Sequence, residues 1–565
     1  MRSISNLFMW HFLKNGAKTI FNKKQDDILS AAFVIAAAVA LSRILGLIRY
    51  RLLAGYFGDE IQLLDGYFAA TTLLDSIFET FIFGSIALAF IPVFSKYLGK
   101  EKLNKAWQLA STLMTMGFLC FMFFAVIFFF FSNEIAALIA PGLVQKFPET
   151  QAKISHLLQI MVLSQSLFVI SIFLTGVLHS FKRFLIPSIA SIFYNVGIIS
   201  SIIFLSPLFG IYSAAIGMIF GALLHFLVQL PLILSLKFKF KFNLNLKDPD
   251  VKAVLILMWP RSITIGLTRL SDVVNVALAS SAAVGSIVAL NFAQVLQVVP
   301  AAFFAASIAQ AAFVFMSIEY NKGKKDQFKS LFLESLHQIL FLVLPAAAIL
   351  AVLRVPVVRL VFGAKDLPWE TTVLASRTLL AFSIGISAAA VNLLLTRGFH
   401  AVRDSYTPVK ISLVTTSLNI ALAFIFILGF KLSIIYLAVA YSISNILAFV
   451  GLMYFLDKKV GGFDRAKLLI PTIKMIIISV LTAVALYIPM KFLDQLVFDT
   501  TKVIGLIVLT SIASASGLAV YILLSWIFKV EQLAIFTKFG KRVITFPSRL
   551  NPPSPTAIGD VKNQT

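Results

Sequence analysis

Long apolar runs recur along the whole chain, and they restrict its fold more than any other feature of the sequence. A bilayer-spanning helix needs a run of about 20 apolar residues, whereas a membrane β-barrel shows alternating segments of about ten. The composition agrees, since 59% of the residues are hydrophobic and 13% are charged. The sequence therefore predicts an all-α polytopic membrane protein of about 14 transmembrane helices. The expected cores are residues 29–54, 64–93, 107–132, 155–180, 185–206, 211–236, 252–282, 286–317, 330–353, 371–398, 406–429, 432–456, 468–491 and 502–528.

Basic residues gather in the short connections between these runs. The formal net charge is +23, which in a soluble protein would suggest a nucleic-acid partner. Here basic residues follow every even-numbered run, so the positive-inside rule explains them and no nucleic-acid partner is expected. The connections that follow odd-numbered runs are mostly not basic, and the exception holds Arg354, Arg359 and Lys365. We expect both termini to lie in the cytoplasm.

Two pairs of similar stretches indicate an internal repeat. SIALAFIPVFS begins at Ser85 and SIAQAAFVFMS at Ser307, an offset of 222 residues (307 − 85). LHSFKRFLIP begins at Leu178 and FHAVRDSYTP at Phe399, an offset of 221 (399 − 178). Each repeat holds six expected helices, an even number, so both copies enter the membrane in the same direction. This predicts two parallel six-helix lobes with a substrate path between them.

The repeat and the flanking composition divide the chain into five expected parts. Residues 1–27 are basic and amphipathic without a cleavage signal, and are read as a cytoplasmic lead-in segment. The N-lobe is expected over residues 28–247 and the C-lobe over 248–460. Residues 461–530 hold the last helix pair, and residues 531–565 form a cytoplasmic tail without a long apolar run.

Motifs for catalysis are missing from the sequence. It has no GxxxxGK[ST] loop for a nucleotide, and its six histidines show no metal-ligand spacing. Cys120 is its one cysteine, which excludes a disulfide within one chain. We therefore expect no catalytic residue, no metal and no cofactor, and we expect a transporter in place of an enzyme. Without a nucleotide motif, a cycle driven by the membrane potential or by an ion is the expected energy source.

Three arginines lie in the second half of the first run, in SRILGLIRYR, from Ser42 to Arg51. A charged side chain inside a membrane costs a few kcal/mol, and it persists when it faces water, an acid or an anionic ligand. Arg43 and Arg51 are eight residues apart, on nearly one side of a helix, while Arg49 points elsewhere. Either Arg49 and Arg51 reach the outer interface, or these side chains line a basic cavity that takes an anionic cargo.

The second run contains acids that have two interpretations. Asp75 and Glu79 are four residues apart and share one helix face, with Asp65 further toward the start. They either neutralise the arginines of the first run as structural ion pairs or carry a coupling proton.

The seventh and eighth runs carry further polar residues. In WPRSITIGLTRLSD, Arg269 and Asp272 are three residues apart and are expected to pair locally, while Arg261 follows the helix-kinking Pro260. In the eighth run, Gln294 is the middle member of a polar stripe with a period of three, which indicates a cavity or a helix contact.

Five stretches resemble the MurJ/MviN family of lipid II flippases. They are SRILGLIRYRLLAGYFG, DGYF, AFIPVFS, GVLHSFKRFLIPSIASIFYNVG and RGFHAVRDSYTPVKISLVTTSLNIAL, in this order within residues 30–460. The family belongs to the multidrug, oligosaccharidyl-lipid and polysaccharide exporter superfamily. The resemblance implies a flippase of the bacterial cytoplasmic membrane. Such a protein moves undecaprenyl-diphosphate-linked lipid II from the inner to the outer leaflet by alternating access, for cell wall synthesis and cell shape.

The resemblance also implies roles for particular residues. Arg43 and Arg49, with Ser42 and Gly46 beside them, match the first-span arginines that hold the diphosphate, and Asp65 matches a second-span aspartate. With Arg261, Arg269 and Gln294, these are the expected substrate-binding residues. The final helix pair would form a groove for the lipid tail, in contact with bilayer lipids.

The chain departs from the family pattern at three places. It reads Phe78-Glu79 where the family usually has an arginine pair, and Phe83-Gly84 where the family has Glu-Gly. It reads Gln294-Val295 where the family usually has Asp-Arg. Three hypotheses follow: a divergent flippase with a rearranged site, an exporter of another lipid-linked oligosaccharide or a drug, and a non-transporting scaffold for cell-wall synthesis proteins.

Overall fold

The computed structural model describes residues 28–83, 89–99, 102–238, 240–496 and 502–534. The expected lead-in segment 1–27 and most of the tail 531–565 lie outside the described residues, as do Gly84, Ser85, Lys100 and Lys239. The structure also leaves undescribed the side chains of residues 28–36, 82–83, 257, 259–261 and 495–496.

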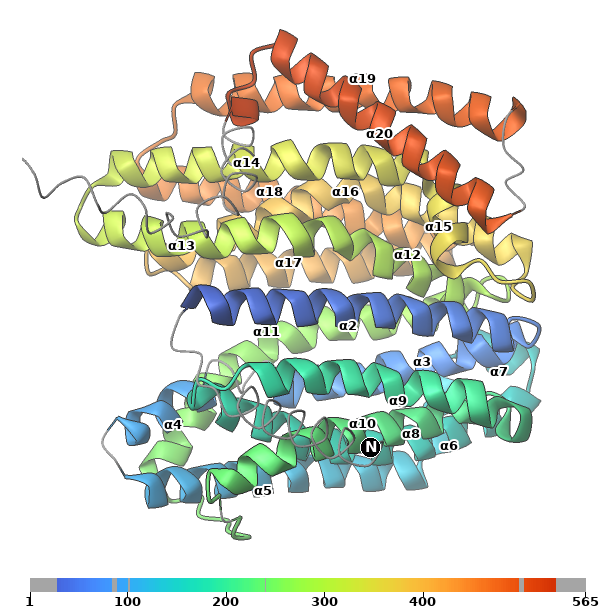
Figure 1. Ribbon diagram of the computed structural model, residues 1–565, viewed down its shortest axis with the longest axis vertical. Coiled ribbons are helices and arrows are strands. Elements are labelled where there is room, and N and C mark those ends of the chain that lie inside the picture. The colour runs from blue at the N-terminus through green and yellow to red at the C-terminus, as the bar shows by residue number, and fades with distance from the viewer. Residues whose placement is uncertain (1–27, 84–88, 100–101, 239, 497–501, 535–565) are drawn as a thin grey trace, which may run out of the picture. The chain divides into compact units, whose positions relative to one another are not determined.

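Every element of the described ranges is a helix (Figure 1). Twelve helices are long and apolar enough to cross a membrane, and α2 and the α3–η1–α4 segment occupy the positions of the first two expected spans. The all-α polytopic prediction is thus confirmed. The elements are α2 (Ile28–Phe57), α3 (Ile61–Phe78), η1 (Glu79–Phe83), α4 (Ile91–Leu98), α5 (Leu103–Phe130), α6 (Ser132–Ile139), α7 (Pro141–Lys146), α8 (Glu149–Ser180), α9 (Leu185–Phe209), α10 (Tyr212–Ser235), α11 (Pro249–Ser280), α12 (Ser286–Pro300), η3 (Ala301–Ala305), α13 (Ala306–Asn321), α14 (Lys325–Val352), α15 (Arg354–Phe362), α16 (Trp369–Ala401), α17 (Tyr406–Phe424), η4 (Ile425–Gly429), α18 (Ile435–Val460), α19 (Arg465–Leu496) and α20 (Val503–Ile527).

The internal repeat is visible in backbone details that the sequence comparison did not use. The π-helices η1 and η3 begin at Glu79 and Ala301, an offset of 222 residues (301 − 79). Lys182 and Arg403, 221 residues apart (403 − 182), both adopt a left-handed conformation, with φ of 57° and 59°. A non-glycine residue with positive φ is uncommon, so its recurrence at equivalent positions supports a duplicated six-helix set.

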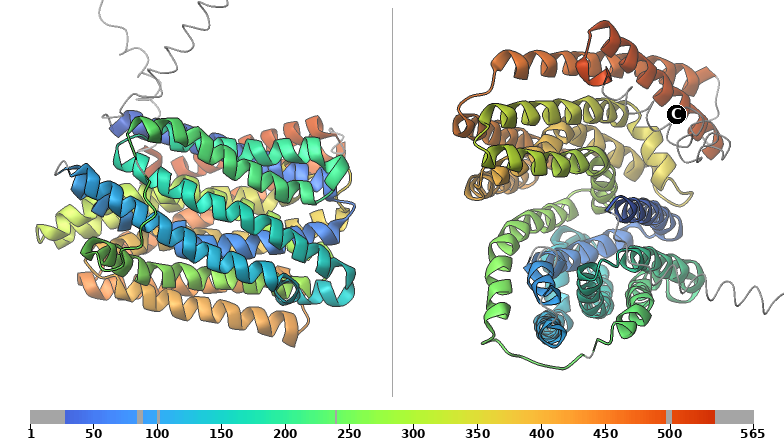
Figure 2. Two further views of the ribbon diagram at one scale, coloured as in Figure 1. Left: turned by 90° about the horizontal axis from the view of Figure 1, so that it is seen from below. Right: turned by 60° about the vertical axis from the view of Figure 1, so that its left-hand side comes forward.

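The described chain separates into two compact units whose boundaries differ from the expected lobes. Of the described residues, unit 1 comprises those up to Gln297 together with Arg354–Gly385 and Val409–Ala448, and unit 2 comprises the others. The seventh expected helix, α11, therefore belongs to the same unit as the first six. Figure 2 shows that α11 bends along its length, and it continues without a break through Pro260.

Aromatic packing forms part of the core of unit 1. Phe292 of α12 stacks on Phe362 of α15, with ring centroids 4.1 Å apart. Tyr50 of α2 stacks on Phe68 of α3 and meets both of the other rings edge-on. Aromatic pairs of this geometry add about 0.5–1.5 kcal/mol each to the burial of their area. They hold α2 and α3 in register with α12.

Glycines let α9 and α10 approach closely. A Cβ atom on Gly197 would lie 2.6 Å from the Cα of Gly221, and one on Gly221 would lie 2.5 Å from the carbonyl oxygen of Tyr194. Small residues allow such contact between membrane helices. The contact fixes where the side chain of Tyr194 points.

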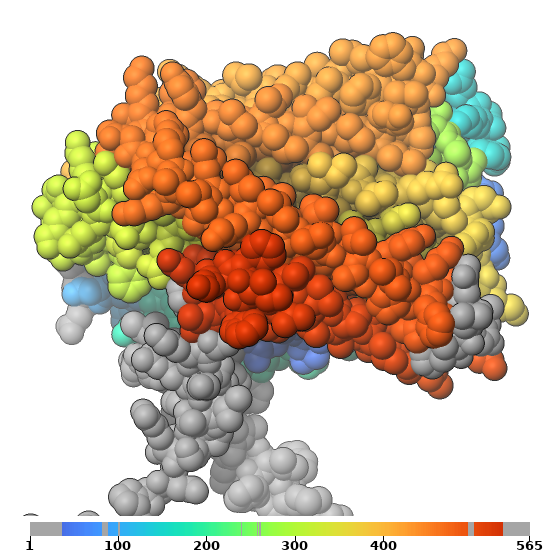
Figure 3. Space-filling view, turned by 90° about the horizontal axis from the view of Figure 1, so that it is seen from above, coloured from blue at the N-terminus to red at the C-terminus, as the bar shows by residue number. Residues whose placement is uncertain are grey.

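Unit 2 contains the last helix pair. α20 packs against α19 through Gly517, where an added Cβ would lie 2.5 Å from Leu486, and Tyr521 donates a hydrogen bond to the carbonyl of Phe341 on α14. Figure 3 shows α19 and α20 side by side at the surface. Large apolar side chains such as Ile504 and Trp526 are exposed there, as expected for helices that face lipid.

Candidate functional site

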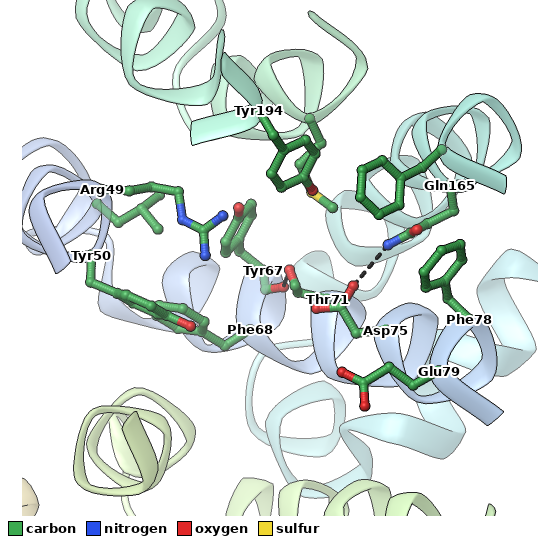
Figure 4. A pocket seen from close by; sticks show the side chains of 13 residues that line it. Arg49, Tyr50, Tyr67, Phe68, Thr71, Asp75, Phe78, Glu79, Gln165 and Tyr194 are labelled. Carbon is green, nitrogen blue, oxygen red and sulfur yellow. Dashed lines mark hydrogen bonds between the residues drawn. The ribbon is translucent and has the colours of Figure 1, made fainter. Parts of the chain in front are cut away.

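A pocket of about 240 Å³ lies within unit 1, among α2, α3, η1, α8, α9 and α10 (Figure 4). Its walls are aromatic and aliphatic, while several polar side chains point into it. These are Arg49, Tyr67, Thr71, Asp75, Glu79 and Gln165. An apolar pocket with a few convergent polar groups is the usual form of a ligand site.

Arg49 is the cation of this pocket. Its guanidinium lies over the ring of Tyr50, 5.2 Å from the ring centroid. Its Nε atom is buried without a hydrogen-bond partner, and Arg49 makes no ion pair with any described residue. A guanidinium N–H that is buried without an acceptor costs free energy. An anionic ligand would supply the missing acceptors.

Neither acid of the pocket, Asp75 or Glu79, forms an ion pair with the described arginine side chains of α2. Asp75 accepts a hydrogen bond of 2.8 Å from Gln165 on α8, and its side chain is exposed, so water can reach the pocket. Glu79 accepts instead from Arg269 of α11. Arg269 also donates to Asp272 over 2.8 Å, which confirms the local pair expected from the sequence.

The three arginines of α2 have three different environments. Arg43 is exposed and makes no hydrogen bond or ion pair to the described part of the chain. Arg49 lines the pocket. Arg51 donates to the carbonyl of Leu360 on α15, over 2.5 Å. The structure therefore brings one of the three to the pocket.

Ser42 and Gly46 lie where α2 contacts α9. The side-chain amide of Asn195 donates a hydrogen bond of 3.2 Å to the Ser42 hydroxyl. A Cβ on Gly46 would lie 4.0 Å from the side-chain oxygen Oδ1 of Asn195. Both residues position α2, one to two turns before Arg49, and neither lines the pocket.

The carboxylate of Asp65 is buried and bonded to the backbone of another helix. Its side chain is 2% exposed, and its oxygens accept from the backbone N–H groups of Gly285 and Val288, over 2.6 and 2.8 Å. These groups lie at the start of α12, where helix N–H groups lack partners. Asp65 therefore caps α12 from a neighbouring helix, and its acceptors are directed away from the pocket.

The other expected residues lie outside the pocket lining. Gln294 is half-buried on α12. The side chain of Arg261 lies outside the described part of α11. Arg269 reaches the pocket rim only through Glu79.

Sequence reasoning missed five polar residues of the lining, namely Tyr50, Tyr67, Thr71, Gln165 and Tyr194. Gln165 carried a usable signal, because a glutamine inside an apolar run needs a partner when buried. The tyrosines carried none, since aromatic residues are common in membrane helices.

These features define a class of protein, the multi-pass membrane transporters that contain two six-helix repeats. Within that class, the sequence model described as "Lipid II flippase MurJ" matches residues 53–507, and the chain belongs to this family.

Two relatives match over most of the chain. The lipid II flippase MurJ of Burkholderia cenocepacia is 25% identical over 439 residues, which are 75% of this chain and 84% of the relative. The probable lipid II flippase MurJ of Borreliella burgdorferi is 25% identical over 472 residues, or 83% and 90% of the two chains.

Solved structures share the fold. A lipid II flippase MurJ in an inward closed conformation matches with a TM-score of 0.71 and 25% identity, covering 88% of this chain and 98% of that one. A multidrug resistance MATE family transporter of the MOP superfamily, inward-facing, matches with a TM-score of 0.59 and 13% identity, over 76% and 98%. The second likeness concerns the fold alone.

Proposed function

We propose that this protein is a lipid II flippase of the bacterial cytoplasmic membrane, moving its cargo from the inner to the outer leaflet by alternating access. Arg49 carries the proposal, because a half-buried guanidinium without an acid partner points into an open pocket of a family member. The guanidinium donors match phosphate oxygens in pairs. No bond is made or broken in this process, so the protein is a transporter and not an enzyme.

The size of the pocket limits what enters it. Pockets for drug-sized ligands hold about 300–1,000 Å³. The volume here, about 240 Å³, suits the phosphate part of the cargo and leaves its sugar and peptide outside. Tyr67 and Tyr194 add hydroxyl groups near the guanidinium for further phosphate oxygens.

We also propose roles for the other expected substrate-binding residues, the two lobes and the last helix pair. Arg43, Arg261 and Gln294 would contact the cargo in other states of the cycle, and Ser42 and Gly46 would position α2. Residues 28–247 and 248–460 would move as the two lobes, with both termini in the cytoplasm. The pair α19–α20 would hold the lipid tail.

Complementation tests the proposal. In a bacterium depleted of its own flippase, the wild-type chain should restore growth and Arg49→Ala should not, at equal levels in the membrane. Arg49→Lys should restore growth only partly, because a lysine keeps the charge but loses the paired donors. Full growth with Arg49→Ala would overturn the proposal.

Glu79 favours a second candidate, export of a different lipid-linked anion. It places a carboxylate beside the pocket where the family usually has a cation. Competition between lipid II and other polyprenyl-diphosphate sugars for the purified protein separates the two candidates, since the cargo should be the tighter ligand.

A further inference from the structure

A strip of charged side chains runs from the pocket onto α11. Arg49, Asp75 and Glu79 line the pocket, and Arg269 and Asp272 continue the strip through their ion pairs. The strip thus holds two cations and three acids. A diphosphate that enters it meets more negative charge than positive, so binding is repelled unless one acid gives up its position.

Glu79 is the acid placed to be exchanged. Its side chain is 38% exposed and that of Arg269 is 36% exposed, so their contact is accessible. A phosphate oxygen pair offers a guanidinium the same planar arrangement of acceptors as a carboxylate. Asp272 sits three residues along the same helix as Arg269 and moves with it. Asp75 is not the acid that pairs with Arg269, because it accepts a hydrogen bond from Gln165.

The backbone around Glu79 is irregular and closely packed. Glu79 begins the π-helix η1, and π-helical turns occur frequently at functional sites. One turn before Arg269, a Cβ on Gly266 would lie 3.1 Å from Thr80 of η1. The Glu79–Arg269 pair thus joins two elements that lie against each other at this level.

Other contacts hold α11 at its two ends. Tyr97 of α4 donates to Asp250 near the start of α11. Ser280 at its end accepts from the backbone N–H of Gly142, over 3.0 Å. Two residues beyond Arg269, the buried Ser271 donates a hydrogen bond of 2.8 Å to Asn419 on α17. Loss of the central pair would therefore loosen α11 from η1, while its ends and its contact with α17 stay in place.

We propose that Glu79 is a resident counter-ion of Arg269, which the diphosphate displaces, so that cargo binding itself releases α11 from η1. The inference rests on the proposed function and adds the step that links binding to movement. Arg269 then supplies, from the seventh span, the cation that the second span lacks.

Binding of undecaprenyl diphosphate in detergent micelles tests this exchange. Glu79→Gln keeps the shape and removes the competing charge, so affinity should rise at least about fivefold, a typical coupling between sites. In an Arg269→Gln background, Glu79→Gln should change affinity little, because its partner is gone. Asp272→Asn is the matched control, since it removes an equal charge from the same guanidinium without freeing α11, and its effect should be smaller.

Hydrogen exchange gives a second readout. Undecaprenyl diphosphate should speed amide exchange over residues 79–83 in the wild-type chain. In Glu79→Gln the exchange should be fast before the ligand is added. An affinity of Glu79→Gln equal to wild type, or an Asp272→Asn effect as large as that of Glu79→Gln, would overturn the exchange. If the wild-type chain does not bind undecaprenyl diphosphate at all, the proposed function fails instead.

Discussion

Arg269 on α11 donates a hydrogen bond to Glu79 on η1, a residue 190 positions earlier in the chain. The pair exchanges the usual arrangement of charges, because the family's second-span cation is here an acid and the cation comes from the seventh span. A charged pair inside a membrane protein persists when both members are satisfied. The acid at Glu79, which departs from the family pattern, is thus paired with a cation of the seventh span.

The cap formed by Asp65 predicts a loss of stability without a loss of affinity. Asp65→Ala leaves the N–H groups of Gly285 and Val288 without acceptors, at a cost of about 1–3 kcal/mol. Asp65→Asn keeps one acceptor oxygen and should cost less. Thermal unfolding in detergent measures both, with lipid II binding as the companion assay. A variant of normal stability that no longer binds would instead place Asp65 in contact with the cargo.

The crossing of α9 and α10 predicts an effect that reaches the pocket. Gly221→Ala forces the added methyl group against the backbone of Tyr194, so we expect a loss of about 1–3 kcal/mol and weaker cargo binding. Gly429→Ala is the control, since no atom lies within 4 Å of the added group. Equal melting temperatures for the two variants would contradict this packing.

The connection between α16 and α17 predicts a pH dependence. Burial alone would raise the pKa of Asp404, but hydrogen bonds from Lys459 and Thr407 outweigh it and lower the pKa to about 2. An aspartate in an unfolded chain has a pKa of about 3.9. The contact therefore stabilises the folded protein fully above that pH and is lost as the pH falls toward about 2.

Asp404→Asn measures this contribution. The variant should melt at a lower temperature than the wild type at pH 7, and the gap should narrow as the pH falls below about 4. A gap that stays constant from pH 7 to pH 3 would mean that the Lys459 contact is not its source.

The fold was readable from the sequence because membrane helices follow local rules. Each span needs its own apolar length, so the last twelve expected cores match the twelve long apolar helices closely, while the short helices α6, α7 and α15 were not expected. The sequence did not predict which helices α11 packs against. Its attachment to η1 and α7 depends on contacts such as Glu79–Arg269 and Gly142–Ser280, which join residues far apart in the chain.

The site was only partly readable for the same reason. The sequence singled out Arg49, but helix geometry alone does not distinguish it from Arg43 and Arg51. The environment of each arginine depends on which other helices pack against that face of α2. Arg51 meets a carbonyl on α15, which no local pattern reveals. Asp65 looked like a site residue because it is an acid in a membrane segment, whereas its partners are the unpaired amides of α12.

The affinity of the purified protein for lipid II, compared between Arg49→Ala and Arg43→Ala, tests the central claim most directly. Both variants remove one arginine from the same helix, but only Arg49 faces the pocket. A hydrogen-bonded charge pair contributes about 1.5–3 kcal/mol, so Arg49→Ala should weaken binding by about 10- to 150-fold, and Arg43→Ala by much less. Unchanged affinity in Arg49→Ala, with Arg43→Ala as the weaker binder, would contradict the account.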